Sequence, residues 1–160
     1  MIDFLKTWKQ VNATTLDLLN CIPEETYHTK PFSPRFRSFS WEFACLLTTR
    51  KMYLLGIKQG KLNGQTECLD DEEVSKLSKE EMFKALEETG TEILRMISEP
   101  KIKEIEYFGE KSSKLNVMSW LFQHEQLHFG KLILYLTQAE IEIPDSLRKM
   151  WGTQSFKKSI

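Results

Sequence analysis

Cysteine is scarce in this sequence, and so are the residues that interrupt regular structure. The 160 residues include 3 cysteines, 5 prolines and 7 glycines. Cys21, Cys45 and Cys68 are odd in number and far apart, and no CxxC pair or zinc-ribbon spacing occurs. A disulfide framework is therefore excluded as the basis of the fold, and the free thiols indicate a reducing, cytoplasmic compartment.

Charge of one sign and long apolar runs are also missing. The net charge is −1, so the sequence offers no basic field for a nucleic-acid backbone. No segment approaches the ~18 uninterrupted apolar residues of a membrane span, and Met1 to Phe4 lack the basic and apolar regions of a signal peptide. We therefore expect a cytoplasmic protein that binds neither nucleic acid nor membrane.

Four stretches carry apolar residues every three to four positions, which is typical of amphipathic helices. They begin near residues 4, 38, 78 and 112 and end near residues 21, 60, 99 and 138. The third has the clearest start, because Ser78 and Glu81 match a capping box. Residues 101–110 favour a short extended piece with a turn at Gly109, and Pro144 can open a short last helix. Sustained two-residue alternation is absent, so residues 1–160 predict one all-α domain, a four-helix bundle.

Two histidines give the strongest chemical signal. His124 and His128 are four residues apart on the apolar stripe of the fourth helix, so both rings share one face. Two such imidazoles can take adjacent positions on one metal ion, with further ligands coming from a facing helix. Spacing alone leaves a second interpretation open, in which both are neutral, hydrogen-bonded core residues.

The same residues match the HExxH pattern of zinc metalloproteases, in which the glutamate, here Glu125, activates water. The rest of the sequence does not support a protease. No third histidine follows at the usual offset, a carboxylate expected about 20 residues on is replaced by Arg148, and no sheet is predicted to hold a peptide. A protease is therefore the remotest interpretation.

The stretch Trp120–Lys131 resembles the last helix of the DinB/YfiT-like family, whose members carry a His-Glu-x-x-His-x-Gly pattern there. An apolar run follows at Leu132–Leu136, and then Ile141–Pro144, as in the family. The start of the second helix, Arg37–Cys45, is also similar. The resemblance covers most of the chain in helix order and length, and implies the four-helix bundle of that family.

The resemblance also implies a metal site of three histidines, one on the second helix and two on the last, which binds zinc or nickel. At the second-helix position, seven residues after Ser38, this sequence has Cys45 instead. Three outcomes follow. Cys45 ligates as a thiolate, Glu42 one turn earlier replaces it as an oxygen ligand, or the site has decayed around an ordinary buried cysteine and no metal binds.

Three other polar residues have open roles. Glu125 either orients a water molecule as a catalytic base or faces solvent, and His28 either reaches the site mouth as a base or is a solvated loop residue. Arg50 interrupts the apolar stripe of the second helix. It pairs with a buried acid, binds an anionic substrate, or extends its stem along the surface.

Two functions remain open. The resemblance implies a metal-dependent enzyme, a thiol-dependent transferase or a hydrolase, that acts on a small molecule with a low-molecular-weight thiol as a candidate partner, and that forms a homodimer. In such an enzyme the metal would activate a water or a thiol at neutral pH. The alternative is a non-catalytic helical module for binding or dimerisation, with a degenerate metal site. The role of Cys45 distinguishes the two.

Overall fold

The computed structural model, which describes residues 3–32 and 35–151, is built on four long helices. These are α1 (Phe4–Asn20), α2 (Phe39–Gln59), α4 (Lys79–Ser98) and α5 (Lys114–Gln138). Shorter elements connect them or follow them: η1 (Glu24–Thr26), α3 (Asp71–Val74) and α6 (Asp145–Trp151), with strands β1 (Lys61–Leu62), β2 (Glu104–Tyr107) and β3 (Glu110–Ser113). The predicted four-helix bundle is confirmed.

The ends of the long helices follow from local chemistry. Ser38, Ser78 and Ser113 each accept a hydrogen bond from a free backbone amide in the first turn of α2, α4 and α5. At α4 the side chain of Glu81 returns a bond to the amide of Ser78, which completes the predicted capping box. Gly60 ends α2 with φ of 72°, a left-handed conformation that glycine adopts without strain.

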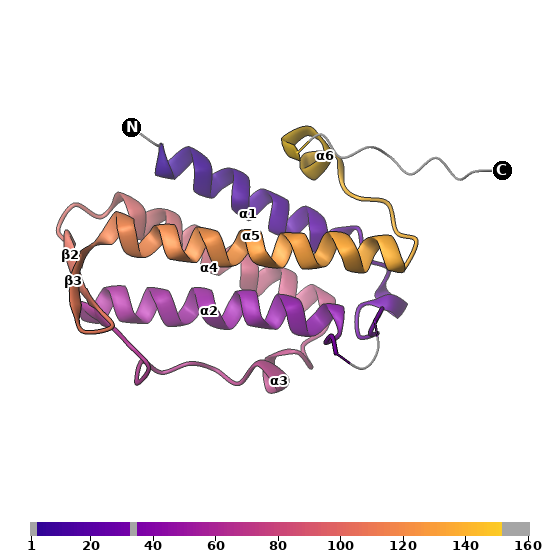
Figure 1. Ribbon diagram of the computed structural model, residues 1–160, viewed down its shortest axis with the longest axis horizontal. Helices are drawn as coiled ribbons and strands as arrows, with labels where there is room; N and C mark the ends of the chain where they lie inside the picture. Colours follow the sequence, from indigo (N-terminus) through magenta and orange to yellow (C-terminus); the bar gives the residue numbers. More distant parts are fainter. Residues whose placement is uncertain (1–2, 33–34, 152–160) are drawn as a thin grey trace.

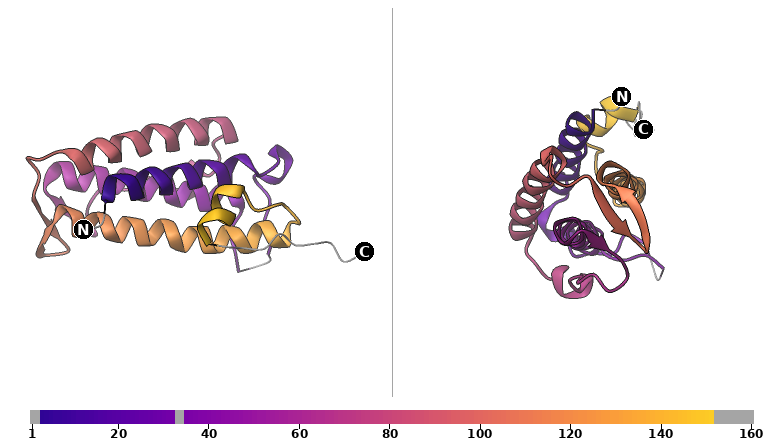
Figure 2. Two further views of the ribbon diagram at one scale, coloured as in Figure 1. Left: turned by 90° about the horizontal axis from the view of Figure 1, so that it is seen from above. Right: turned by 90° about the vertical axis from the view of Figure 1, so that its left-hand side faces the viewer.

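The helices surround the core as a ring, with α1 against α4 and α5, and α2 against the same two helices. Figure 2 shows this order from the end of the bundle, and Figure 1 shows α2 and α5 lying lengthwise beside each other. The pairing of α2 with α5 determines the site, because it brings residues about 80 positions apart in the sequence into contact.

A small sheet covers one end of the bundle, which sequence periodicity did not predict. Strand β1 pairs in parallel with β2, and β2 pairs antiparallel with β3. Figure 1 shows β2 and β3 at the left end of the bundle. The β2–β3 turn contains Phe108 and Gly109, both with positive φ, which is the backbone that a two-residue hairpin requires. The extended piece with a turn at Gly109 is thus present, but as part of a three-stranded sheet.

The first strand is held down by close packing. Leu62 of β1 is fully buried over Gly56 of α2, where an added Cβ would lie 2.7 Å from the leucine Cβ. A glycine is therefore required at position 56 for the strand to approach the helix. Among the described residues, no helix is long and apolar enough to cross a membrane.

Candidate metal centre

His124 and His128 lie near the middle of α5 and face α2. Their ring centroids are 4.5 Å apart, and the two Nε2 atoms are 3.2 Å apart. The rings meet because side chains four residues apart on a helix stand one above the other. His128 is buried and His124 is only partly exposed, so the pair lies at the edge of the core.

Cys45 on α2 completes a group of three. Its Sγ lies 3.8 Å from Nε2 of His124, and the three candidate ligand atoms are all within 4.8 Å of one another. Tetrahedral zinc, with bonds of about 2.3 Å to sulfur and 2.05 Å to nitrogen, separates two nitrogens by about 3.3 Å and sulfur from nitrogen by about 3.6 Å. The spacing of 3.2 Å between the two nitrogens and that of 3.8 Å between the sulfur and Nε2 of His124 are both close to these values.

The pKa values of Cys45 and His124 determine which protons a metal ion would have to displace on binding. Burial, reinforced by the nearby charges of Asp71 and Glu42, raises the pKa of the Cys45 thiol to about 12. Burial and the neighbouring His128 lower the pKa of His124 to about 4. At neutral pH the metal-free protein therefore holds a neutral thiol beside a neutral imidazole, and a cation must displace the thiol proton.

Glu42 stands behind His128 rather than among the three converging atoms. Its Oε2 lies 2.7 Å from Nδ1 of His128, a close contact between carboxylate and imidazole whose N–H direction is not that of a well-aligned hydrogen bond. The carboxylate also accepts hydrogen bonds from Lys131 and Tyr135. Burial opposes ionisation of Glu42, but His128 and Lys131 outweigh it and hold its pKa below the usual value.

This contact assigns the tautomer of His128. A carboxylate at Nδ1 favours the proton on that atom, which leaves the lone pair of Nε2 pointing at the cluster. His124 differs, because its Nδ1 is buried without a hydrogen-bond partner in the structure. Its contacts are made by Nε2, which lies 3.8 Å from Sγ of Cys45.

Arg50 and Glu125 form a buried ion pair on the neighbouring side of α5. Both side chains are 0% exposed, and the guanidinium donates from Nε to one carboxylate oxygen and from Nη2 to the other, each at 2.8 Å. Arg50 also donates to Thr15, Asn12 and the carbonyl of Leu86. Of the roles open to Arg50, the structure shows pairing with a buried acid. Glu125 is correspondingly engaged by Arg50 and does not face solvent.

His28 lies on an exposed turn, with its ring edge-on to Tyr27 at 4.7 Å, and is not one of the three converging residues.

Sequence reasoning missed three neighbours of the cluster. Thr49 Oγ1 is 3.5 Å from Nε2 of His124, Lys131 contacts Glu42, and the charge of Asp71 acts on both Cys45 and His124. Helical spacing could have found two of them, since Lys131 follows His128 by three residues and Thr49 follows Cys45 by four.

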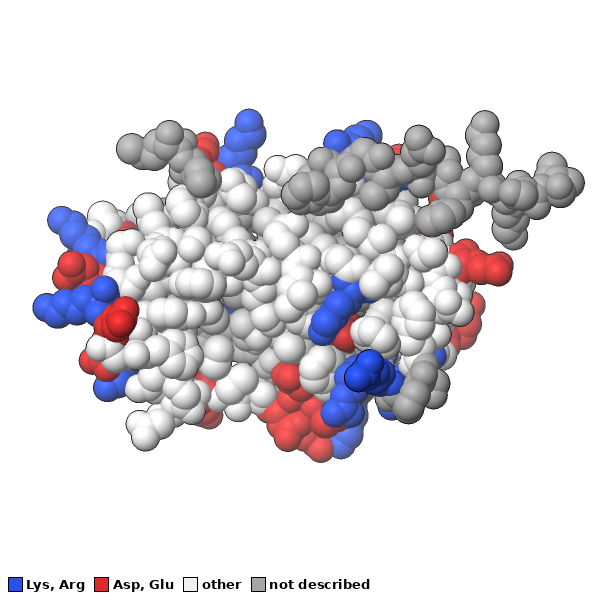
Figure 3. All heavy atoms as spheres, in the orientation of Figure 1, with Lys and Arg blue, Asp and Glu red and all other residues white. Residues whose placement is uncertain are grey.

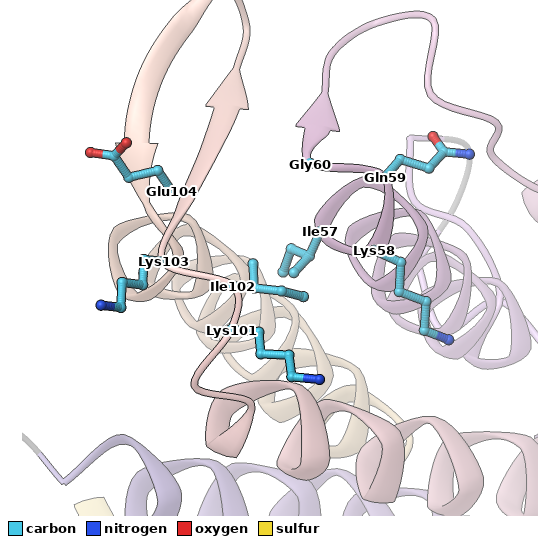
Figure 4. A pocket seen from close by; sticks show the side chains of 8 residues that line it. All are labelled: Ile57, Lys58, Gln59, Gly60, Lys101, Ile102, Lys103 and Glu104. Carbon is cyan, nitrogen blue, oxygen red and sulfur yellow. The ribbon is translucent and has the colours of Figure 1, made fainter.

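A separate hollow near the sheet contains no comparable chemistry. It lies beside the C-terminal end of α2, about 18 Å along the helix from Cys45, and has a volume of about 530 Å³. Figure 4 shows Lys58 and Lys103 pointing away from each other, on either side of Ile57 and Ile102. Its lysines are exposed, so nothing buried is directed at a ligand.

The fold and the cluster define the chain as a four-helix-bundle protein with a Cys-His-His group that could hold a metal ion. The sequence profile of the DinB family matches residues 1–154, and the chain belongs to that family. It is similar to a crystal structure of a DinB-like protein from Bacillus cereus ATCC 10987, with a TM-score of 0.70 and 18% identity, over 88% of this chain and 93% of that one. No curated protein matches the chain.

Proposed function

We propose that this protein is a divalent-metal-dependent enzyme whose metal is bound by Cys45, His124 and His128. The observation that carries the proposal is the convergence of the three ligand atoms within 4.8 Å, with two of their spacings, 3.2 and 3.8 Å, close to those of tetrahedral coordination. One thiolate with two imidazoles suits zinc, and three protein ligands leave a position open, as in catalytic zinc sites.

The substrate we propose is a small molecule, and the reaction is transfer to or from a thiol, or hydrolysis. A bound divalent cation would lower the pKa of a water or of a substrate thiol, and so supply a nucleophile at neutral pH. Partial exposure of Cys45 and His124 supports access from solvent.

Other residues near the cluster would orient a ligand and bind the substrate. Glu42 keeps the proton of His128 on Nδ1, so that Nε2 stays available as a ligand. Lys131, with a side chain 32% exposed beside Glu42, would be available to bind an anionic group of the substrate. Arg50 is not available for that role because its donors are already used inside the bundle.

The test is the metal content per chain, measured by elemental analysis on protein purified without chelators or a histidine tag. We expect about one zinc or nickel ion per chain, with loss of metal in Cys45→Ser and in His124→Ala. Cys68→Ser is the matched control, because Cys68 is exposed and outside the cluster. Cys45→His restores the three-histidine pattern that the family resemblance implies, and should bind metal as well.

The other outcomes are distinct. Metal lost in His124→Ala but retained in Cys45→Ser would move the third ligand away from Cys45. A parent protein that takes up neither zinc nor nickel would contradict the enzyme proposal and leave a non-catalytic helical module. Metal-loaded and metal-free protein would then be compared with low-molecular-weight thiols and electrophilic acceptors, and with ester and amide substrates.

A further inference from the structure

The half-buried face of α2 carries a tryptophan next to a candidate metal ligand. From Phe39 to Arg50 three positions are half-buried and the others are buried, and the three recur every four residues: Trp41, Cys45 and Thr49. Residues at this spacing lie on one side of a helix. Trp41 is therefore the neighbour of Cys45 one turn toward the start of α2, on the side that solvent and a ligand can reach.

Two cationic side chains from different elements lie over the Trp41 ring. Cζ of Arg37, in the segment before α2, is 5.5 Å from the ring centroid, and Nζ of Lys131, in α5, is 6.0 Å from it. Both are within the range of a cation–π interaction. Lys131 follows His128 by three residues. The ammonium therefore comes from the turn after one candidate ligand, just as the indole comes from the turn before another.

The segment that carries Arg37 is packed against α5. The ring of Phe36 lies edge-on to that of Tyr135, with centroids 5.9 Å apart. Tyr135 follows Lys131 by four residues, so the two share one face of α5. We refer to Arg37, Trp41 and Lys131 as the basic-aromatic cluster, which joins the start of α2 to α5 beside the candidate metal centre.

Both cations of the basic-aromatic cluster keep hydrogen-bond donors for a ligand. Arg37 pairs with Glu72 of α3 at 2.8 Å, but the two side chains are 55% and 57% exposed, and such a pair contributes little to stability. Within the described part of the chain, Lys131 donates to one group, the carboxylate of Glu42, which also contacts His128. An ammonium has three donors and a guanidinium has five.

The ion pair with Glu72 shows which kind of ligand the basic-aromatic cluster accepts. A guanidinium is a planar fork of donors that matches a planar carboxylate, and Arg37 holds one in the structure. Figure 3 shows basic and acidic side chains side by side around α3 and the start of α2. Because the pair lies at the surface, another carboxylate can replace Glu72. A divalent ion bound by one thiolate and two neutral imidazoles would add a net positive charge nearby, which also favours an anion.

We propose that the basic-aromatic cluster binds a carboxylate group of the substrate. The inference rests on the proposed function and specifies its substrate as a small carboxylic acid. The carboxylate would displace Glu72 from Arg37 and accept a hydrogen bond from Lys131, while the adjoining part of the molecule packs on the indole of Trp41. The basic-aromatic cluster is one helical turn from the candidate ligands, so a spacer of about three or four bonds would separate the carboxylate from the reacting atom.

The test measures thiol binding to the cobalt-loaded protein, because a thiolate bound to Co²⁺ gives an absorption band without any turnover. The probes are 3-mercaptopropionate and its uncharged counterpart, 3-mercaptopropionamide. We expect the acid to bind about tenfold more tightly than the amide. Arg37→Gln and Lys131→Gln should each reduce this preference to about threefold or less, with the cobalt content measured in both. Arg95→Gln, at an exposed position of α4, is the matched control and should leave the preference unchanged.

Removal of Glu72 gives a test of the opposite sign. Glu72→Gln frees Arg37 from the carboxylate that competes with the ligand, so the acid should bind about threefold more tightly or better, and the amide as before. Glu73→Gln is the matched control, because Glu73 is an exposed carboxylate of the same helix that pairs with Lys76 instead. A purely structural role of the Arg37–Glu72 pair would not tighten binding when the pair is broken.

The outcomes separate this inference from the proposed function. A protein that takes up no Co²⁺, or that gives no thiolate band with either probe, would contradict both. Bands with equal dissociation constants for the acid and the amide would leave the proposed function standing and overturn the carboxylate site. So would a preference for the acid that survives both Arg37→Gln and Lys131→Gln, because the carboxylate would then be bound elsewhere.

Discussion

The buried pair of Arg50 and Glu125 allows a quantitative prediction. Glu125→Leu would leave the guanidinium of Arg50 without its carboxylate in a place with 0% exposure. Arg50→Leu would likewise leave the Glu125 carboxylate without its main partner. Removing one member of a buried ion pair costs about 3–5 kcal/mol. Since a domain of this kind is stable by about 5–15 kcal/mol in total, either change removes a large share of the free energy of unfolding.

The double variant Arg50→Leu/Glu125→Leu should cost less than the sum of the two single variants. It leaves no isolated charge, although Thr15, Asn12 and the Leu86 carbonyl lose a donor at about 1 kcal/mol each. A coupling energy of about 2 kcal/mol or more is therefore expected between positions 50 and 125. Urea unfolding followed by circular dichroism, in the presence of a chelator, measures all four proteins without a contribution from metal.

The surface pair of Lys58 and Glu92 is the control. Its side chains are about half exposed, so Glu92→Leu should change stability by less than about 1 kcal/mol. A cost below about 1 kcal/mol for Glu125→Leu, or simple additivity in the double variant, would refute the reasoning. Either result would mean that Arg50 and Glu125 do not form this pair in solution.

Three further changes test the surroundings of the cluster. In metal-free protein, burial lowers the pKa of His124 to about 4, so the unfolded chain binds a proton that the folded chain does not. As the pH drops from about 6.5 to about 4, the free energy of unfolding of the parent protein should therefore fall by up to about 3 kcal/mol more than that of His124→Asn. Glu42→Gln should weaken zinc affinity by about 10–100-fold, measured against a chromophoric chelator, because the support of His128 is lost. Gly90→Ala should destabilise the fold by about 1–3 kcal/mol in thermal unfolding, because its Cβ would lie 2.2 Å from Oδ1 of Asn12.

Each of these has its own control. An equal pH slope in the parent and in His124→Asn would show that His124 titrates normally in the folded state. Tyr135→Phe separates the roles of Glu42, because Tyr135 binds the other carboxylate oxygen and should change zinc affinity much less. Gly130→Ala should instead stabilise the helix by about 1 kcal/mol, since a Cβ added at Gly130 would meet no atom within 4 Å.

The long helices could be predicted because their signals are local. A serine before each of the last three, the capping box at Ser78 and the left-handed Gly60 all act within a turn of the chain. The sheet could not be predicted in the same way. Strand β1 has two residues and pairs with Glu106 and Tyr107, more than 40 positions away, so its stability comes from tertiary contacts that leave no periodic trace.

In the candidate site, too, local contacts could be predicted from the sequence and contacts between helices could not. His124 and His128 share a helix face, so their contact follows from spacing alone. Cys45 was placed with them only by the family resemblance, because no local pattern links α2 to α5. The partnership of Arg50 with Glu125 depends on how two helices rotate against each other. A lone charged residue in an apolar stripe does not reveal whether it meets an opposite charge or water.

The separation of the buried ion pair from the three candidate metal ligands has an evolutionary consequence. Neither position 50 nor position 125 can lose its charge alone without leaving the other buried and uncompensated, so related sequences should change both together or neither. Position 45 is under a different constraint, because a cysteine and a histidine can each donate to the same ion without disturbing that pair. Natural variation in this family should therefore show positions 50 and 125 changing together, and position 45 changing independently of both.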